Sequence, residues 1–179
     1  SLGQAARMVG RGKRVLMIQF IKGPWKSGED FIEIANRKSQ GADREEGYFE
    51  LRKRGKGFVG ILGDDLPRED HVEAARAALN EFKTELASNT PASAPQSGAT
   101  AGKWDCIILD EINNAVHLNL LSKEEVLDVV KNLPPKQFVI FSGRGAPQEF
   151  IDRADLVTEM REIKHPFNNG KMAEIAVEF

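Results

Sequence analysis

The sequence is poor in residues that form covalent or metal cross-links. It has one cysteine, Cys106, and three histidines, His71, His117 and His165. A single cysteine excludes an internal disulfide, and its place in the apolar run 106–109 favours an unreactive thiol in the core. The histidines lack the close pairing that is typical of zinc ligands. A structural transition-metal site is therefore not expected.

Long apolar runs and a strong charge of either sign are also missing. No run approaches the roughly 20 apolar residues that span a bilayer, and residues 1–7 lack the basic and then apolar layout of a signal peptide. The formal net charge is -2, which indicates neither a basic nucleic-acid surface nor an acidic tail. We expect a cytoplasmic protein with no nucleic-acid or membrane partner.

Apolar runs of two kinds alternate along the chain. Short buried strands are expected over residues 14–20, 104–111, 137–141, 155–160 and 172–179, and residues 48–51 and 57–59 fit a strand or a loop. Helices are expected over residues 2–9, 30–37, 70–87, 122–132 and 147–153. Apolar residues recur at steps of three and four along 70–87 and give that helix one apolar face, and Ser122 and Glu125 fit a capping box at the start of 122–132. Strands that alternate with helices predict an α/β fold, a mostly parallel sheet with helices on both faces.

The length fits one domain, which we expect to span residues 1–179. Within it, residues 88–103 are small or polar and contain no large apolar side chain. Such a segment gains too little from burial to offset the entropy of ordering, so it predicts a mobile insertion.

Two carboxylates end the apolar run 107–109. Ligands of parallel α/β folds bind at the carboxyl ends of the strands, and Asp110 and Glu111 stand at such an end. Carboxylate oxygens suit Mg²⁺ held together with substrate phosphates. The alternative for this acidic pair is an ordinary helix cap or turn.

Basic and aromatic side chains follow other expected strands. Arg144 ends the strand 137–141 within a glycine-rich turn, where its planar fork suits phosphate oxygens; the alternative is a surface arginine. Arg7 and Lys22 either face an anion at the same edge or are solvated charges. Phe58, between glycines, is either a mobile aromatic lid or a partly buried anchor.

Six segments together resemble one enzyme family. They are QFIKG at 19–23, GF at 57–58, ILDEIN at 108–113, SGRGAP at 142–147, ADLVTEM at 154–160 and KHPF at 164–167. Their order and spacing are similar to those of the ATP:corrinoid adenosyltransferases of cobalamin synthesis and corrinoid salvage. The resemblance runs along the whole chain, broken mainly at 40–54 and 88–103. It implies a RecA-like fold of the P-loop NTPase type.

The resemblance also implies an activity and a set of site residues. Family members transfer the 5′-deoxyadenosyl group of ATP to the cobalt of a reduced corrinoid and release triphosphate, using Mg²⁺ or Mn²⁺. It implies that Glu111, with Asp110, holds the metal and ATP, that Arg7 and Arg144 lie near the phosphates, and that Phe58 closes over the corrinoid near Lys22. A homodimer and a reductase partner are further implications.

The chain departs from the family pattern in two places. It contains no G-x-x-x-x-G-K-[ST] loop, whose amides and lysine cradle phosphates at a helix start, and we expect that loop to be encoded upstream of Ser1. Gly60 stands where the family often has tryptophan. These departures keep two alternatives open: a non-catalytic relative that binds or scaffolds, and a general P-loop ATPase.

Overall fold

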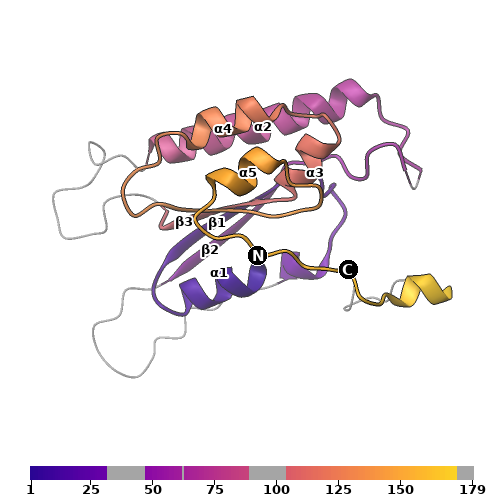
Figure 1. The fold of residues 1–179 in the computed structure, drawn as a ribbon, viewed down its shortest axis with the longest axis horizontal. Helices are drawn as coiled ribbons and strands as arrows, with labels where there is room; N and C mark the ends of the chain where they lie inside the picture. Colours follow the sequence, from indigo (N-terminus) through magenta and orange to yellow (C-terminus); the bar gives the residue numbers. More distant parts are fainter. Residues whose placement is uncertain (32–46, 62, 89–103, 173–179) are drawn as a thin grey trace.

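The computed structural model describes residues 1–31, 47–61, 63–88 and 104–172. Its strands are β1 (Arg14–Gln19), β2 (Tyr48–Lys53), β3 (Cys106–Asp110) and β4 (Phe138–Phe141). Its helices are α1 (Leu2–Val9), α2 (Arg68–Ala87), α3 (Ile112–His117), α4 (Lys123–Val130) and α5 (Gln148–Arg153), with 3-10 turns at Gly28–Phe31 and Pro166–Asn169. Helix α1 covers one face of the sheet and α2 to α5 lie on the other (Figure 1).

All four strands are parallel and lie in the order β2-β1-β3-β4. The register pairs Gln19 of β1 with Asp110 of β3, and Leu109 of β3 with Phe141 of β4. The last residues of three strands therefore meet at one edge. The sheet and its two helical layers confirm the predicted α/β fold.

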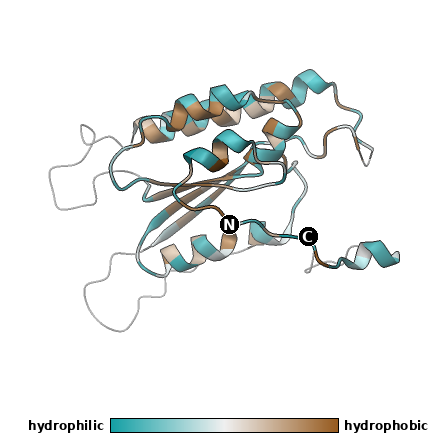
Figure 2. Cartoon of the chain, viewed as in Figure 1, coloured by the Kyte–Doolittle hydropathy of each residue, from teal (hydrophilic) through white to brown (hydrophobic). Residues whose placement is uncertain are grey.

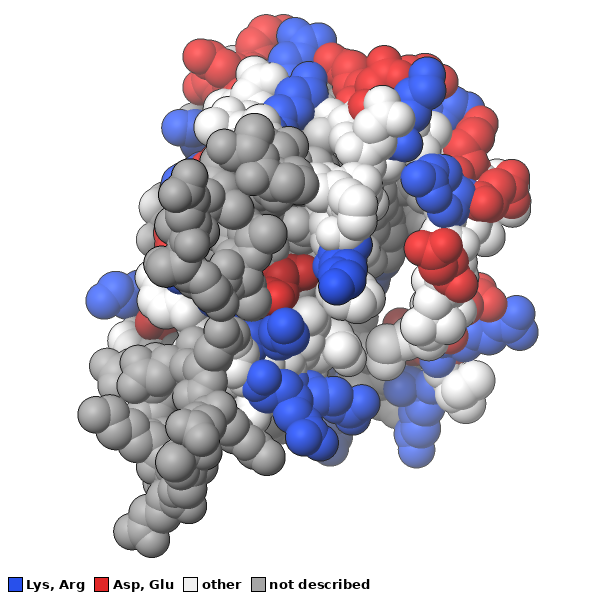
Figure 3. Space-filling model, turned by 90° about the vertical axis from the view of Figure 1, so that its left-hand side faces the viewer, with Lys and Arg blue, Asp and Glu red and all other residues white. Residues whose placement is uncertain are grey.

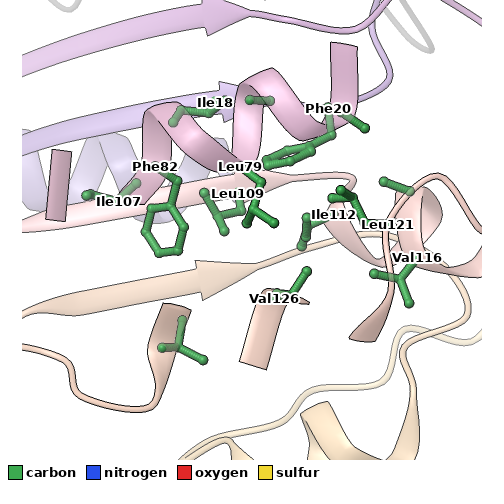
Figure 4. Close-up of a cluster of buried hydrophobic side chains, with 14 of the residues drawn as sticks. Ile18, Phe20, Leu79, Phe82, Ile107, Leu109, Ile112, Val116, Leu121 and Val126 are labelled. Atoms are coloured by element: carbon green, nitrogen blue, oxygen red, sulfur yellow. The ribbon is translucent and has the colours of Figure 1, made fainter. Parts of the chain in front are cut away.

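Apolar side chains form two buried clusters, one on each face of the sheet, and the strands of the sheet are largely brown in Figure 2. The larger cluster packs α2 onto the strands, with Phe82 and Leu79 against Ile107 and Leu109 (Figure 4). These side chains are at most 3% exposed. Burial of each contributes about 1.5–3 kcal/mol, so this layer fixes the sheet on which the site depends.

The smaller cluster packs α1 onto the opposite face. Ala5 and Val9 of α1 contact a layer that includes Met17, Ile108 and Cys106. Burial first, and the nearby Asp105 carboxylate second, raise the pKa of the Cys106 thiol to about 12. The prediction that Cys106 lies in the core is confirmed.

The strongest local sequence signals match the observed helices. The apolar residues expected on one face of 70–87 are on the buried side of α2, including Ala75, Leu79 and Phe82. Ser122 and Glu125 form the predicted capping box of α4, since each side chain accepts a hydrogen bond from the other residue's backbone N–H. In α2 and α4, the local sequence signal and the tertiary packing favour the same helix.

Two expected strands differ in the structure, and one segment predicted as a strand or a loop is a loop. Residues 155–160 form no strand, because no described strand pairs with their backbone; Leu156 and Met160 are 85% and 93% exposed. Strand β4 forms as predicted but is not buried, because it is the outermost strand among the described residues, and Phe138 is 60% exposed. Residues 57–59 form a loop.

Several other predictions fall on residues outside the described ranges. They are the insertion at 88–103, apart from Ser88, most of the helix at 30–37 and nearly all of the strand at 172–179. The described start of the expected helix, Asp30 and Phe31, belongs to the 3-10 turn Gly28–Phe31.

The surface carries charges of both signs. Figure 3 views the end of the sheet at which the strands begin, and there Lys and Arg side chains lie among Asp and Glu side chains. This mixture agrees with the net charge of -2. Among the described residues, no helix is both long and apolar enough to cross a membrane.

Candidate functional site

Asp110 lies at the centre of a polar network at the carboxyl edge of the sheet. Its Oδ1 accepts hydrogen bonds from the hydroxyls of Ser142, at 2.7 Å, and Ser1, at 3.1 Å. Its Oδ2 accepts one from Gln19 Nε2 at 3.0 Å. Donors from β1, from the start of α1 and from the loop after β4 therefore orient one carboxylate.

Glu111 joins β3 to α3 in an unusual backbone conformation. Its φ is 62°, a left-handed value that non-glycine residues seldom adopt. Its N–H donates to Ser142 Oγ at 3.2 Å, and its buried Oε2 has no hydrogen-bond partner among the described residues. This conformation places the Glu111 carboxylate at the carboxyl edge of the sheet, where its Oε2 accepts no hydrogen bond from a described residue.

The electrostatics of Glu111 follow from this position. Burial first, and the neighbouring Asp110 carboxylate second, raise its pKa, while the positive charges of Lys22 and Arg144 act in the opposite direction. The structure thus brings four of the predicted site residues within electrostatic reach of one another. A cation bound beside Glu111 would favour its ionised form.

Asp110 and Glu111 are the residues here that suit a divalent cation. Within the described ranges, no group of three or more His, Cys, Asp or Glu side chains forms a complete metal site. Mg²⁺ requires no such group, because it is commonly held by one or two carboxylates, waters and substrate phosphates. The unpartnered Oε2 of Glu111 is an acceptor of the kind such an ion would use.

The loop that carries Arg144 depends on a glycine. Gly143 has φ +120°, and a Cβ placed there would lie 2.3 Å from Asn114 Oδ1. That oxygen accepts a hydrogen bond of 2.7 Å from the Arg144 N–H. The loop is therefore anchored to α3, while the Arg144 side chain is exposed at the edge.

Lys22 and Arg7 have different surroundings. Lys22 forms an ion pair with Glu29, whose Oε1 also accepts a hydrogen bond of 3.3 Å from Gln19 Nε2. Arg7 is exposed and lies six residues after Ser1 in α1, which is about 9 Å along a helix axis. The structure gives Arg7 no hydrogen bond or ion pair with another described residue, so it does not bring Arg7 to the acidic pair.

Phe58 lies on the loop after β2 and is 46% exposed. Its ring contacts the indole of Trp25, which comes from the loop after β1. Gly60, two residues later, has φ +69° and open space around a Cβ placed there. The Phe58 ring is thus half-exposed and packs against Trp25.

The sequence interpretation missed the residues that orient the acids, chiefly Gln19, Ser142 and Asn114. One signal was available: Gln19 is a polar residue at the end of an apolar strand, and it is 1% exposed. A buried amide needs partners, so its position indicated a polar neighbour on the adjacent strand. Ser142 and Asn114 carried no comparable signal.

Comparisons with known proteins agree with this arrangement. The family described as ATP:corrinoid adenosyltransferase BtuR/CobO/CobP matches residues 1–179. The corrinoid adenosyltransferase of Escherichia coli (strain K12) is 31% identical over 183 residues, covering 100% of this chain and 78% of the relative. Corrinoid adenosyltransferase CobA of Salmonella typhimurium gives the same identity and coverage.

A relative from a third genus has a similar sequence identity. The corrinoid adenosyltransferase of Pseudomonas aeruginosa is 32% identical over 179 residues, which cover 100% of this chain and 76% of the relative. The predicted family resemblance is therefore confirmed along the whole chain. This protein belongs to the ATP:corrinoid adenosyltransferase BtuR/CobO/CobP family.

Proposed function

We propose that this protein transfers the 5′-deoxyadenosyl group of ATP to the cobalt of a reduced corrinoid and releases triphosphate, in cobalamin biosynthesis or salvage. Membership of the family supports the reaction. The observation that carries the site assignment is the meeting of Asp110, Glu111 and Arg144 at one edge, with a carboxylate oxygen that lacks a partner among the described residues.

The reaction is a nucleophilic displacement. The electron pair of cobalt(I) forms the cobalt–carbon bond at C5′ of ATP, and the C5′–oxygen bond breaks with its electrons leaving on triphosphate. No proton needs to be removed from the nucleophile, so the protein needs no general base. Its tasks are to orient the two substrates, stabilise the leaving triphosphate and exclude water.

Glu111 and Asp110 would hold the divalent cation, whose chemistry is to neutralise charge on the phosphate oxygens. The hydrogen bonds from Gln19, Ser1 and Ser142 fix the Asp110 carboxylate before the substrate arrives. Preorganised groups of this kind stabilise developing charge without reorganisation during the reaction. We assign the two acids a role in ATP binding as well as in metal binding.

Arg144 would donate paired hydrogen bonds to the triphosphate as negative charge grows on it. The glycine-dependent loop supports this role, because it fixes the backbone of Arg144 to Asn114 and leaves the guanidinium at the edge. Arg7 would lie near the phosphates, as the family resemblance implies.

Phe58 and Lys22 would contact the corrinoid. Phe58 offers a half-exposed ring that excludes water, and Lys22 offers a cation for the polar rim of the substrate. Cobalt(I) is a strong reductant that does not persist in air, so the reaction needs an electron donor, and we infer a reductase as a partner. Which corrinoid is used depends on contacts beyond these two residues.

An adenosylation assay on the full-length gene product tests the proposal. Purified protein is incubated with MgATP and chemically reduced cob(I)alamin, and the cobalt–carbon product is followed by its absorbance. We expect turnover in the wild type and a loss of at least about 100-fold in kcat for Glu111→Ala, because removal of one preorganised charge-stabilising group typically has that effect. Unchanged turnover in Glu111→Ala would refute the metal role.

A further inference from the structure

Two aromatic rings from separate loops form an exposed pair. The centroids of Trp25 and Phe58 lie 6.0 Å apart, and their planes are inclined by 32°. Trp25 is 53% exposed and Phe58 46%. Large apolar side chains gathered at a surface are typical of a binding site, so the pair requires an occupant or a structural reason.

The indole of Trp25 is seated against backbone that only glycine provides. A Cβ at Gly23 would lie 2.9 Å from the ring, and a Cβ at Gly57, where φ is +116°, would lie 2.3 Å from it. Lys53 Nζ also donates a 3.0 Å hydrogen bond to the Trp25 carbonyl. The position of Trp25 is therefore built by two stretches of the chain, its own loop after β1 and the stretch from Lys53 to Gly57.

The ring pair belongs to the same edge of the sheet as the acidic pair. The Gly57 N–H donates to the Ile21 carbonyl at 2.9 Å, which ties the Phe58 loop to the end of β1. Two residues earlier, Gln19 donates to Asp110. A molecule on the two rings would thus be adjacent to a nucleotide bound at Asp110 and Glu111.

We propose that Trp25 is a second corrinoid-binding aromatic residue that packs with Phe58 against the flat apolar surface of the macrocycle. The inference rests on the proposed function, since the reaction requires the cobalt to meet C5′ of an ATP bound at this edge. Aromatic faces suit a broad, flat, largely apolar ligand, and two rings cover more of it than one. They also exclude water from the cobalt.

Kinetics of Trp25 variants in the full-length gene product test the inference. For Trp25→Ala we expect KM for cob(I)alamin to rise about tenfold, the range typical of losing one stacked aromatic contact, while KM for ATP changes by less than about twofold. Trp25→Phe keeps a ring and should recover most of the loss. Should Trp25→Ala lose its cooperative melting transition, Trp25→Leu replaces it, with the same shift expected.

The matched control is Phe138→Ala. Phe138 is a 60% exposed aromatic at the first residue of β4, the opposite end of that strand from the site, and its loss should leave KM for cob(I)alamin unchanged. An unchanged KM for cob(I)alamin in Trp25→Ala, or an equal rise in both KM values, would overturn the inference while an active wild type upholds the proposed function. A wild type that makes no adenosylated product would overturn both.

Discussion

The hydroxyl of Ser142 donates a 2.7 Å hydrogen bond to Asp110 Oδ1. Ser142 Oγ in turn accepts a 3.2 Å hydrogen bond from the N–H of Glu111. One side chain on the loop after β4 therefore orients both acids at the end of β3. The two strands are held in register at the residues on which the proposed chemistry depends.

Ser142→Ala should lower kcat/KM for ATP by about 10- to 100-fold, because a hydrogen bond to a charged group contributes about 1.5–3 kcal/mol and about 1.4 kcal/mol corresponds to a factor of ten. Steady-state adenosylation at varied ATP concentration measures the effect. Ser122→Ala is the control: it removes the cap of α4 and should lower the free energy of unfolding by about 1 kcal/mol without changing kcat/KM. Equal loss of kcat/KM in both variants would contradict the role of Ser142.

Glu111→Gln should stabilise the fold while it abolishes turnover. Burial raises the pKa of Glu111, so the folded protein holds this proton more tightly than the unfolded chain does. The ionised carboxylate therefore costs stability as pH rises from the unfolded pKa through the raised folded one. We expect a Tm gain of about 1–3 °C for Glu111→Gln at pH 7 that vanishes below about pH 4.

Glu125→Gln is the matched control for that experiment. The backbone N–H of Ser122 lowers the pKa of Glu125, so its carboxylate stabilises the fold above the unfolded pKa and the gain is lost as pH falls through the folded one. The substitution should therefore lower Tm at pH 7. Melting curves recorded across pH distinguish the expected rise in Tm for Glu111→Gln from the expected fall for Glu125→Gln. A lower Tm for Glu111→Gln at pH 7 would contradict the burial of an unpaired carboxylate.

Gly143→Ala should displace the Arg144 loop. The new Cβ would collide with Asn114 Oδ1 at 2.3 Å, in a backbone conformation with φ +120° that alanine avoids. We expect the free energy of unfolding to fall by about 1–3 kcal/mol and kcat to fall more than about tenfold. Urea denaturation and the adenosylation assay measure the two effects.

Gly3→Ala should have the opposite effect on the free energy of unfolding. Gly3 lies within α1 with open space at its Cβ position, so alanine should raise the free energy of unfolding by about 0.5–1 kcal/mol. If Gly143→Ala were as well tolerated as Gly3→Ala, the loop would not require glycine.

Cys106 should not react with a thiol reagent in the native protein. Its pKa is about 12 and its side chain is fully buried, so almost no thiolate is accessible at pH 8. Ellman's reagent should modify one thiol per chain in urea and none without it. Rapid modification of the native protein would show that the apolar cluster between α1 and the sheet, which contains Cys106, opens readily.

The parts of the fold that the sequence predicted are those with a local cause. The apolar face of α2 and the capping box of α4 depend on residues three or four positions apart, which can be read along the chain. Residues 155–160 show where a prediction from the local pattern fails. Their apolar pattern is typical of a strand, but a strand also needs a neighbouring backbone, and the pattern of one segment carries no information on its neighbour.

The candidate site also contains residues that the sequence predicted and residues that it did not. Asp110, Glu111 and Arg144 were predicted because strand ends in a parallel sheet gather at one edge. Ser142 and Asn114 were missed because their roles are hydrogen bonds to residues 30 to 32 positions away, set by strand register and the Gly143 turn. The role of Arg7 stays a prediction from family resemblance.

The most direct test of the central claim is the stoichiometry of products. The full-length gene product is incubated with MgATP and cob(I)alamin, and the products are resolved by anion exchange and mass spectrometry. Our account predicts one adenosylated corrinoid and one inorganic triphosphate for each ATP consumed. Release of ADP and phosphate without a cobalt–carbon product would contradict it and would indicate an ordinary ATPase.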